Sequence, residues 1–354
     1  MKTRKKILIT GGHVTPAIAL IDKLKQQGDA DIVFIGRPQE YHLITEKGIR
    51  FLPLMTGRVG RTFTRHWLPS LLKIPFGFAA AMWYVLGERP SLVVSFGGYI
   101  AFPVALSAWI LRVPILTHEQ TRAAGLTNRI IGRIAKRVCV AYEDMIGQFP
   151  KGKAVYTGLP MRKELFAPSK TAPYPAREKT YPVLYITGGS LGAQSLNRLI
   201  YPIIAKLTQT WTVIHQVGAH SLADAKKIRD PRYIAEAYIS VEKLSWVLHH
   251  AVMVMGRSGA NTTMELAALG KVAILIPLPW AGANEQQLNA EWLGRRGGAW
   301  VLPQKGLTPA KILSTIAAVW RDRGEYQKRA TTLAPAIYRD GDTRMVREIN
   351  ALLP

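Results

Sequence analysis

The sequence has a single cysteine and few acidic side chains, and both scarcities restrict what the protein can be. Cys139 cannot form an internal disulfide, which favours a reducing compartment without excluding a cysteine-poor secreted protein. Lys and Arg number 47 against 23 Asp and Glu, giving a formal net charge of +24. Residues 1–160 hold 22 basic and 9 acidic residues and the remainder 25 and 14, so the charge is not a basic tail. Nucleic acid, anionic lipid and phosphorylated substrates are the candidate partners.

Long apolar runs are also scarce. The first, Ile7–Ile9, ends at a Thr-Gly-Gly turn, whereas a signal peptide needs about 7–15 apolar residues, so we expect no secretion. Pro90–Leu111 is uncharged over 22 residues, which is long enough to span a membrane. Two glycines and Pro103 interrupt it, so we expect the strand Leu92–Phe96 and a helix that begins near Pro103.

Short β-branched runs alternate with helical patterns along the whole chain, which is typical of βαβ units and parallel sheets. The expected strands are Lys6–Thr10, Asp31–Ile35, Leu92–Phe96, Pro114–Thr117 and Arg137–Ala141 in a first series, and Val183–Thr187, Thr212–Gln216, Ala251–Met255 and Val272–Pro277 in a second. Many are apolar throughout, as strands covered on both faces should be.

The strand series restarts at residue 183, after the segment Pro168–Pro182 with its four prolines, the best linker candidate. At about 100–200 residues per domain, 354 residues suggest two domains. Each half opens with a strand, a glycine-rich turn and a helix. The sequence therefore predicts an α/β protein of two Rossmann-like, parallel-sheet halves that face a cleft.

Both opening turns are candidate ligand sites. Gly188–Ala193 resembles a phosphate-binding loop, because glycines admit a ligand to the backbone and the next helix offers free N–H groups. It lacks a P-loop lysine, and its spacing departs from Gly-x-Gly-x-x-Gly. Thr10–His13 adds a histidine that can act as a general base. For Gly188–Ala193 the alternative is a tight strand-to-helix turn. For His13 it is a packing residue at a helix start.

Two later segments suit a nucleotide sugar. Arg257–Glu265 combines hydroxyls with a helix start, which suits a pyrophosphate, and Glu265 can accept hydrogen bonds from ribose hydroxyls. The alternative is a helix capped by its own carboxylate. The amide cluster Asn284–Asn289 suits sugar hydroxyls or, equally, a solvated helix start.

Polar groups also end two strands of the first half. His118-Glu119-Gln120 follows Pro114–Thr117, and Gly97-Gly98-Tyr99 follows the preceding strand. The carboxyl ends of parallel strands share one edge, so these groups and His13 should converge there.

A basic segment precedes an aromatic one in the first half. Arg58, Arg61 and Arg65 come before the apolar stretch Ile74–Leu86. The aromatic residues of that stretch are Phe76, Phe78, Trp83 and Tyr84. Such a pattern suits an anionic membrane surface. The uncharged run Ile74–Gly87 has 14 residues, fewer than the roughly 20 needed to span. The alternative is a buried helix behind a solvated loop.

These motifs together resemble one family. They are Thr10-Gly11-Gly12-His13-Val14-Thr15-Pro16, Gly97-Gly98-Tyr99, His118-Glu119-Gln120 with Ala124-Gly125-Leu126-Thr127-Asn128, Thr157-Gly158-Leu159-Pro160-Met161-Arg162, Gly188-Gly189-Ser190-Leu191-Gly192-Ala193, Arg257-Ser258-Gly259-Ala260 and Gln286-Gln287. In this order they resemble the MurG family, which transfers N-acetylglucosamine from UDP-GlcNAc to lipid I, giving lipid II for peptidoglycan. The resemblance runs from the first strand to about residue 300.

The resemblance implies a GT-B fold, an inverting mechanism, and neither a metal nor another cofactor. It implies an acceptor- and membrane-facing domain over 1–158 and a UDP-sugar domain over 159–334, with a helix of about 335–354 packing back on the first. The implied partners are UDP-GlcNAc, a lipid-linked acceptor and an anionic membrane surface, with no nucleic acid. The implied location is peripheral, at the cytoplasmic face of the cell membrane.

The resemblance also assigns site residues. It assigns UDP-GlcNAc binding to Thr10, Gly11, Gly12, Thr121, Arg162, Ser190, Ile239, Ala260, Asn261, Thr262, Thr263, Met264, Glu265, Gln286 and Gln287. Within this set, backbone groups near Ile239 would read the uracil edge. Gly97, Gly98 and Tyr99 would lie on the acceptor pyrophosphate side. His13 is the expected base, with Glu119 as the next candidate, and Arg58, Arg61, Arg65, Phe76, Phe78 and Trp83 would contact the membrane.

The sequence departs from the family pattern at five positions. Leu8 and Ile9 replace two glycines, Thr121 and Leu159 each replace an asparagine, and Asn261 replaces a leucine. One amide contact to the sugar is therefore missing. Alternatives are another UDP-sugar enzyme of this fold, such as a glycolipid glycosyltransferase or a UDP-GlcNAc 2-epimerase, and a non-enzymatic membrane- or nucleic-acid-binding module. The glycine loops, His13 and Gln286 together favour an enzyme.

Overall fold

The computed structural model describes residues 5–28, 30–57, 67–167, 172–174 and 181–353. The chain divides into two compact units, and each is described by itself. Unit 1 comprises residues up to Met161 and from Tyr338 onward, and unit 2 comprises Arg162–Ile337. The family resemblance puts the corresponding boundaries after residue 158 and near residue 335.

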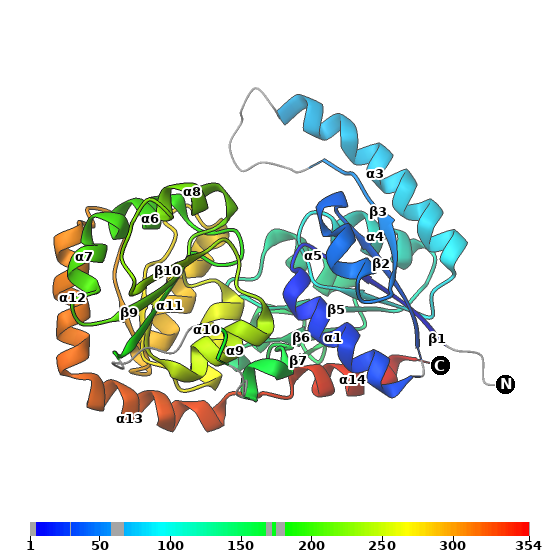
Figure 1. Cartoon of the computed structure of the whole chain (residues 1–354). Helices are drawn as coiled ribbons and strands as arrows, with labels where there is room; N and C mark the ends of the chain where they lie inside the picture. The colour runs from blue at the N-terminus through cyan, green and yellow to red at the C-terminus, as the bar shows by residue number, and fades with distance from the viewer. Residues whose placement is uncertain (1–4, 29, 58–66, 168–171, 175–180, 354) are drawn as a thin grey trace. The chain divides into compact units, whose positions relative to one another are not determined.

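Unit 1 contains a seven-stranded parallel sheet in the order β3-β2-β1-β4-β5-β6-β7 (Figure 1). Its strands are β1 (Lys5–Thr10), β2 (Ala30–Gly36), β3 (Arg50–Pro53), β4 (Leu92–Ser95), β5 (Ile115–Glu119), β6 (Arg137–Val140) and β7 (Ala154–Tyr156). Its helices are α1 (Val14–Gln27), α2 (Tyr41–Thr45), α3 (Trp67–Glu88), α4 (Ala101–Ile110), α5 (Leu126–Ile134) and α14 (Gly341–Leu352), with short 3-10 turns η1 (Pro38–Glu40) and η2 (Glu143–Gln148).

The core of unit 1 joins the central strands to helices from both ends of the chain. Ile7 and Ile9 of β1 and Phe34 of β2 pack in one cluster with Leu20 of α1. Met345 of α14 is buried in the same cluster, and α14 lies against α1. The last helix therefore completes the core of unit 1 by covering apolar side chains of α1.

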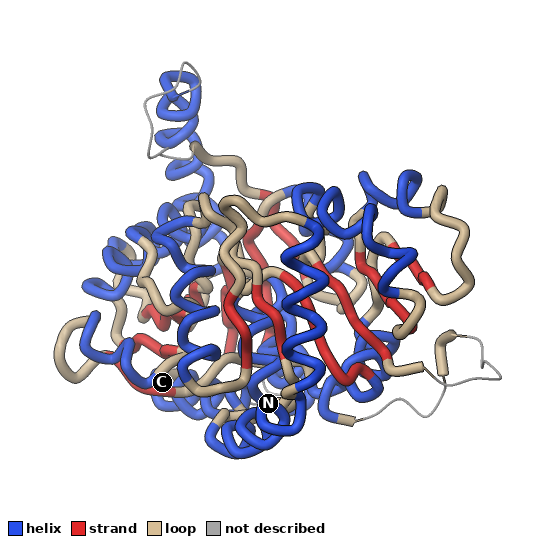
Figure 2. The backbone as a smooth tube through the Cα atoms, turned by 90° about the vertical axis from the view of Figure 1, so that its left-hand side faces the viewer, coloured by secondary structure: helices blue, strands red, loops and turns tan. Residues whose placement is uncertain are grey.

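Unit 2 contains a six-stranded parallel sheet in the order β10-β9-β8-β11-β12-β13. Its strands are β8 (Val183–Thr187), β9 (Thr212–Gln216), β10 (Tyr233–Glu236), β11 (Ala251–Gly256), β12 (Ala273–Leu275) and β13 (Ala299–Val301). Its helices are α6 (Gln194–Ile200), α7 (Ile204–Leu207), α8 (Leu222–Ala225), α9 (Val241–His250), α10 (Ala260–Ala268), α11 (Glu285–Arg295), α12 (Pro309–Arg321) and α13 (Arg323–Leu333). Its 3-10 turns are η3 (Lys163–Phe166), η4 (Tyr201–Ile203), η5 (Ala219–Ser221), η6 (Gly282–Asn284) and η7 (Ala334–Ala336). Figure 2 shows strands lying between helices, the arrangement expected of βαβ units.

The predicted α/β architecture with two parallel sheets is confirmed, and all nine expected strands are present. Four further strands, β3, β7, β10 and β13, were not predicted, and each lies at an edge of its sheet. Strand β5 continues to Glu119, so His118 and Glu119 are strand residues and do not follow the strand as expected.

The proline-rich segment Pro168–Pro182 does not mark the passage between the units. Leu165 of η3 is buried in unit 2, and Ser245 Oγ of α9 donates a hydrogen bond to Ala167 O at 2.7 Å. The chain has therefore entered unit 2 before residue 168, because η3 packs against α9. Most of the segment lies outside the described residues.

The uncharged stretch Pro90–Leu111 forms β4 and α4, which confirms the predicted interruption of a spanning helix. The aromatic segment is part of α3, a single helix of 22 residues with Pro75 inside it. Across the described part of the chain, no helix combines the length and the apolar character that crossing a bilayer requires.

Candidate active site

In unit 1, two glycine turns meet at the carboxyl edge of the sheet, between β1 and β4. The strand order reverses direction at this point, which is where ligands bind in open α/β sheets. The N–H of Gly12 donates to Gly97 O at 2.9 Å. A side chain on Gly11 would lie 2.7 Å from Phe96 Cβ, so the turns approach as closely as they do only because glycine is present. Tyr99 is half-buried in the turn that follows Gly98.

His13 stands at this edge as the residue before α1. Burial, and then the nearby charge of Arg37, lower the pKa of His13 to about 4. The imidazole is therefore neutral near pH 7 and has a nitrogen lone pair with which to accept a proton.

His118 and Gln120 lie at the same edge, where the sequence motif His118-Glu119-Gln120 was expected, although neither was assigned a role of its own. His118 is buried, and its Nε2–H donates to Gly158 O at 3.0 Å, because a carbonyl can only accept. Burial lowers the pKa of His118 to about 4. Among the described residues, the buried hydroxyl oxygen Thr10 Oγ1 has no hydrogen-bond partner. A buried hydroxyl without a partner is costly, which is consistent with a polar ligand at this edge.

Glu119, the other predicted catalytic residue, is fully occupied by local hydrogen bonds. One carboxylate oxygen accepts from the backbone N–H and the hydroxyl of Thr121, both at 2.8 Å. The other accepts from Asn128 Nδ2 at 2.9 Å and Gly125 N at 3.3 Å. Burial raises the pKa of Glu119, and these four donors oppose the rise. In this arrangement Glu119 ties the end of β5 to the start of α5.

In unit 2, the glycine-rich loop Gly188–Ala193 connects β8 to α6. Gly192 lies against Val217 and Gly218, with no room for a side chain. Ser190 is exposed at the loop tip. Beside the loop lies a hollow of about 400 Å³, lined by Gly188, Gly192, Ala193, Gln194, Ser195, Arg198, Arg257, Leu278, Trp280 and Gln286. The loop thus presents backbone and hydroxyl groups next to two arginines, which suits an anion.

The second ligand segment of unit 2 runs from Arg257 into α10. Arg257 Nη2 donates to Ser195 Oγ at 2.8 Å and Nη1 donates to Ile276 O at 3.0 Å, so this arginine fastens the loop to α6 and β12. Ala260, Asn261 and Thr262 are partly exposed in the first turn of α10, whereas Thr263 and Met264 are buried. Met264 could therefore contribute backbone only.

Arg162 and Glu265 form an ion pair, Nη2 to Oε1, at 2.9 Å. Both side chains are largely buried, so each charge depends on the other for solvation. The pair brings together two predicted site residues from distant parts of the sequence.

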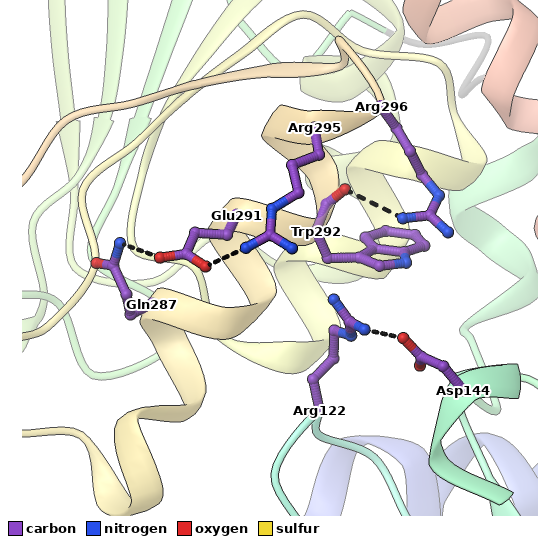
Figure 3. Close-up of polar contacts among 7 residues, drawn as sticks. All are labelled: Arg122, Asp144, Gln287, Glu291, Trp292, Arg295 and Arg296. Carbon is purple, nitrogen blue, oxygen red and sulfur yellow. Dashed lines mark hydrogen bonds and ion pairs between the residues drawn. The ribbon is translucent and has the colours of Figure 1, made fainter.

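The predicted amide residues of α11 are already hydrogen-bonded. Gln286 Oε1 accepts from Leu278 N at 3.0 Å, and Gln286 O accepts from Ser258 Oγ at 2.7 Å. Gln287 Nε2 donates to Glu291, which also pairs with Arg295 (Figure 3). Gln286 thus holds the loop after β12, while the amide of Gln287 points along its own helix.

Ile239, predicted to contact uracil, is buried between β10 and α9. Its N–H donates to Gln216 Oε1 at 3.2 Å, and Gln216 Nε2 donates to Gly189 O at 2.7 Å. Gln216 was missed in the sequence, where the only signal was a polar residue at the end of an apolar strand.

The predicted membrane residues that the structure describes lie on α3. Phe76 is 78% and Trp83 75% exposed, whereas Phe78 is half-buried. Arg58, Arg61 and Arg65 lie outside the described residues. The described part of the chain holds no group of three or more His, Cys, Asp or Glu side chains placed to bind a metal ion.

Comparison with known proteins identifies the family of both halves of the chain. Residues 10–140 match the glycosyltransferase family 28 N-terminal domain, and residues 183–343 match the family 28 C-terminal domain. The UDP-N-acetylglucosamine--N-acetylmuramyl-(pentapeptide) pyrophosphoryl-undecaprenol N-acetylglucosamine transferase of Clostridium tetani is 32% identical over 334 residues, 92% of either chain. That of Lachnoclostridium phytofermentans is 34% identical over 331 residues, covering 91% of this chain and 92% of the other.

Solved structures show the same likeness in three dimensions. MurG of Acinetobacter baumannii superposes with a TM-score of 0.74 at 26% identity, over 98% of this chain and 99% of that one. The UDP-GlcNAc 2-epimerase of Neisseria meningitidis reaches the same TM-score at 13% identity, over 98% of this chain and 100% of that one, and shows the fold alone. The two parallel sheets are therefore those of the GT-B fold, and the chain belongs to the MurG family of glycosyltransferases.

Proposed function

We propose that the protein transfers N-acetylglucosamine from UDP-GlcNAc to lipid I, producing lipid II and UDP with inversion at the anomeric carbon. The observation that carries this proposal is the similarity to transferases of that name, which exceeds 30% identity and extends through both units. The motif residues lie at the carboxyl edges of both sheets, where an α/β protein binds its ligands.

The donor would bind to unit 2. The loop at Ser190 and the first turn of α10 offer N–H groups to the diphosphate, and Glu265 accepts hydrogen bonds from the ribose. Arg162, held by Glu265 at 2.9 Å, adds positive charge for the departing diphosphate. These groups supply charge stabilisation without a metal, so we expect none to be required.

The reacting groups would meet beside His13. The acceptor hydroxyl oxygen forms a bond to the anomeric carbon as the bond from that carbon to the phosphate oxygen breaks. The hydroxyl proton passes to the neutral imidazole of His13, and UDP leaves with the electron pair of the broken bond. Glu119 contributes by holding Thr121 and Asn128 in place rather than by taking the proton itself.

The acceptor is a lipid, so unit 1 must reach a membrane surface. Leu72, Phe76, Trp83 and Leu86 are exposed on α3 at spacings of 4, 7 and 3 residues, which puts them on one stripe of the helix. Gly77, Ala81 and Val85 on another side of α3 are buried. An apolar stripe on an attached helix suits insertion into a lipid interface, and we place the protein peripherally at the cytoplasmic face of the cell membrane.

A transfer assay with lipid I and a panel of UDP-sugars tests this function. We expect lipid II to form with UDP-GlcNAc in preference to UDP-glucose, with turnover unchanged by EDTA. Conversion of UDP-GlcNAc to an isomer without any acceptor would instead indicate an epimerase. No turnover of any UDP-sugar on lipid I would contradict the proposal.

A further inference from the structure

Gln216 links the two segments of unit 2 that the proposed donor would touch. It is the last residue of β9 and is 4% exposed. Its amide nitrogen donates to Gly189 O at 2.7 Å, in the glycine-rich loop, and its amide oxygen accepts from Ile239 N at 3.2 Å. The orientation of the amide is unambiguous, because a carbonyl can only accept and an N–H can only donate.

Neither segment has regular structure at the point where Gln216 holds it. Gly189 has a φ of +84°, and its carbonyl also accepts a turn bond from Gly192 N at 3.0 Å. Ile239 lies between the end of β10 and the start of α9, outside any strand or helix. The Ile239 N–H therefore depends on this buried carboxamide for its partner, and the two hydrogen bonds of the amide fix the separation between Ile239 and Gly189.

The opposite face of β9 anchors α6, the helix that follows the glycine-rich loop, independently of Gln216. The side chain of His215, the residue before Gln216, points to the opposite face of the sheet. Its Nε2–H donates to Asn197 Oδ1 of α6 at 3.2 Å. Asn197 Nδ2 donates in turn to Val217 O at 2.8 Å. Loss of the Gln216 amide should thus release the loop tip and Ile239 while α6 stays attached to the sheet.

We propose that Gln216 is a positioning residue for the nucleotide: it sets the spacing between the diphosphate-binding loop and the base-binding residue Ile239. This inference rests on the proposed function and on the expected contact of uracil with backbone groups near Ile239, so that a uridine diphosphate would occupy both segments at once. Gln216 itself need not touch the ligand. A ligand that spans both segments should then depend on Gln216, whereas a ligand that reaches only the base segment should depend on it less.

The test is calorimetric titration of the full chain with UDP and with uridine. Gln216→Met removes both hydrogen bonds at similar volume, and Gln216→Asn keeps a buried carboxamide that is too short to reach both partners. Gln327→Met is the matched control. Gln327 lies on α13, and its Nε2 also donates to a glycine carbonyl, Gly270 O, at 2.9 Å. All variants are checked for parental thermal unfolding.

We expect both Gln216 variants to raise the Kd for UDP about tenfold or more, and the Kd for uridine by less than about threefold. The KM for UDP-GlcNAc should rise with the UDP Kd while kcat changes little, and Gln327→Met should match the parent. Unchanged UDP affinity in a folded Gln216 variant would overturn the proposal, as would equal weakening of UDP and uridine. Failure of the parent chain to bind UDP would refute the proposed function itself, which separates the two outcomes.

Discussion

The carboxyl edges of the two sheets are built from the same elements but use their polar side chains differently. In unit 1, His13 and His118 both have a pKa lowered to about 4, and Thr10 Oγ1 is buried without a hydrogen-bond partner among the described residues. In unit 2, Gln216, Arg257 and Gln286 are engaged with backbone and side-chain groups around them. The first edge offers the neutral imidazole of His13 for chemistry, and the second uses these three side chains to hold a backbone surface for a ligand.

This difference predicts which property, the rate of the chemical step or the affinity for the ligand, a substitution in each unit should change. A free, neutral histidine can transfer a proton, so its loss should reduce the chemical step. A side chain that fixes a loop changes the affinity of that loop for its ligand, so its loss should weaken binding. Rate effects should therefore come from unit 1 and donor-binding effects from unit 2.

The largest expected effect is on the rate, through His13. His13→Ala should lower turnover by about 10²–10⁴ because the acceptor hydroxyl loses its base. Since the pKa of His13 is lowered to about 4, chiefly by burial, the parent should lose this contribution only as the pH falls toward 4, not near 6.5. Single-turnover transfer measures it, with His42→Ala, an exposed histidine of α2, as the control. Near-parental turnover in His13→Ala would remove His13 from this role.

The next largest effect is expected on membrane binding, again through residues of unit 1. Phe76→Ser with Trp83→Ser should weaken binding to anionic vesicles by at least about tenfold, since burying one large apolar side chain is worth about 1.5–3 kcal/mol. UDP affinity should not change. Co-sedimentation measures binding, and Trp300→Ser, which changes a partly exposed tryptophan of unit 2, is the control. Equal sedimentation of the double variant and its parent would show that α3 does not dock.

A smaller effect is expected on nucleotide affinity in unit 2. Glu265→Ala should weaken UDP binding by about 1–3 kcal/mol, because it removes the ribose acceptor and leaves Arg162 buried without its partner. Calorimetry measures the change. Asp224→Ala, which breaks the exposed pair with Lys227, should have little effect. If ADP and UDP bind the parent equally well, unit 2 does not select uridine.

The smallest expected effect is on the pH dependence of stability. It concerns the structural histidine His215, for comparison with His13 and His118 at the site. Burial lowers the pKa of His215 to about 3, against about 6.5 when unfolded. The unfolded state binds more protons between these values, so the free energy of unfolding should fall as the pH drops from about 6.5 toward 3. His215 can contribute a slope of up to about 1.4 kcal/mol per pH unit. Denaturant unfolding at pH 7 and pH 5 should show a shallower dependence in His215→Gln, and an unchanged dependence would exclude this role.

The central strands were predictable from the sequence, and the edge strands were not. Strands such as Leu92–Ser95 and Val183–Thr187 are almost wholly buried, so their apolar runs are clear in the sequence. The missed strands have three or four residues each, and β3 (Arg50–Pro53) and β10 (Tyr233–Glu236) include charged ones. An edge strand has a neighbour on one side only and tolerates polar residues, so its local signal is weak.

Within the candidate site, the sequence by itself indicated which residues lie near the strand ends: His13 and Glu119 in the first sheet, and the turns at Gly188 and Arg257 in the second. That information is local, because glycines and polar groups interrupt apolar runs at fixed positions. Only the tertiary structure decided what these residues do there. The Arg162–Glu265 pair and the Gln216 bridge join segments that are separated along the chain. Such contacts, and the pKa values that burial imposes on His13 and His118, exist only after the strands have packed side by side.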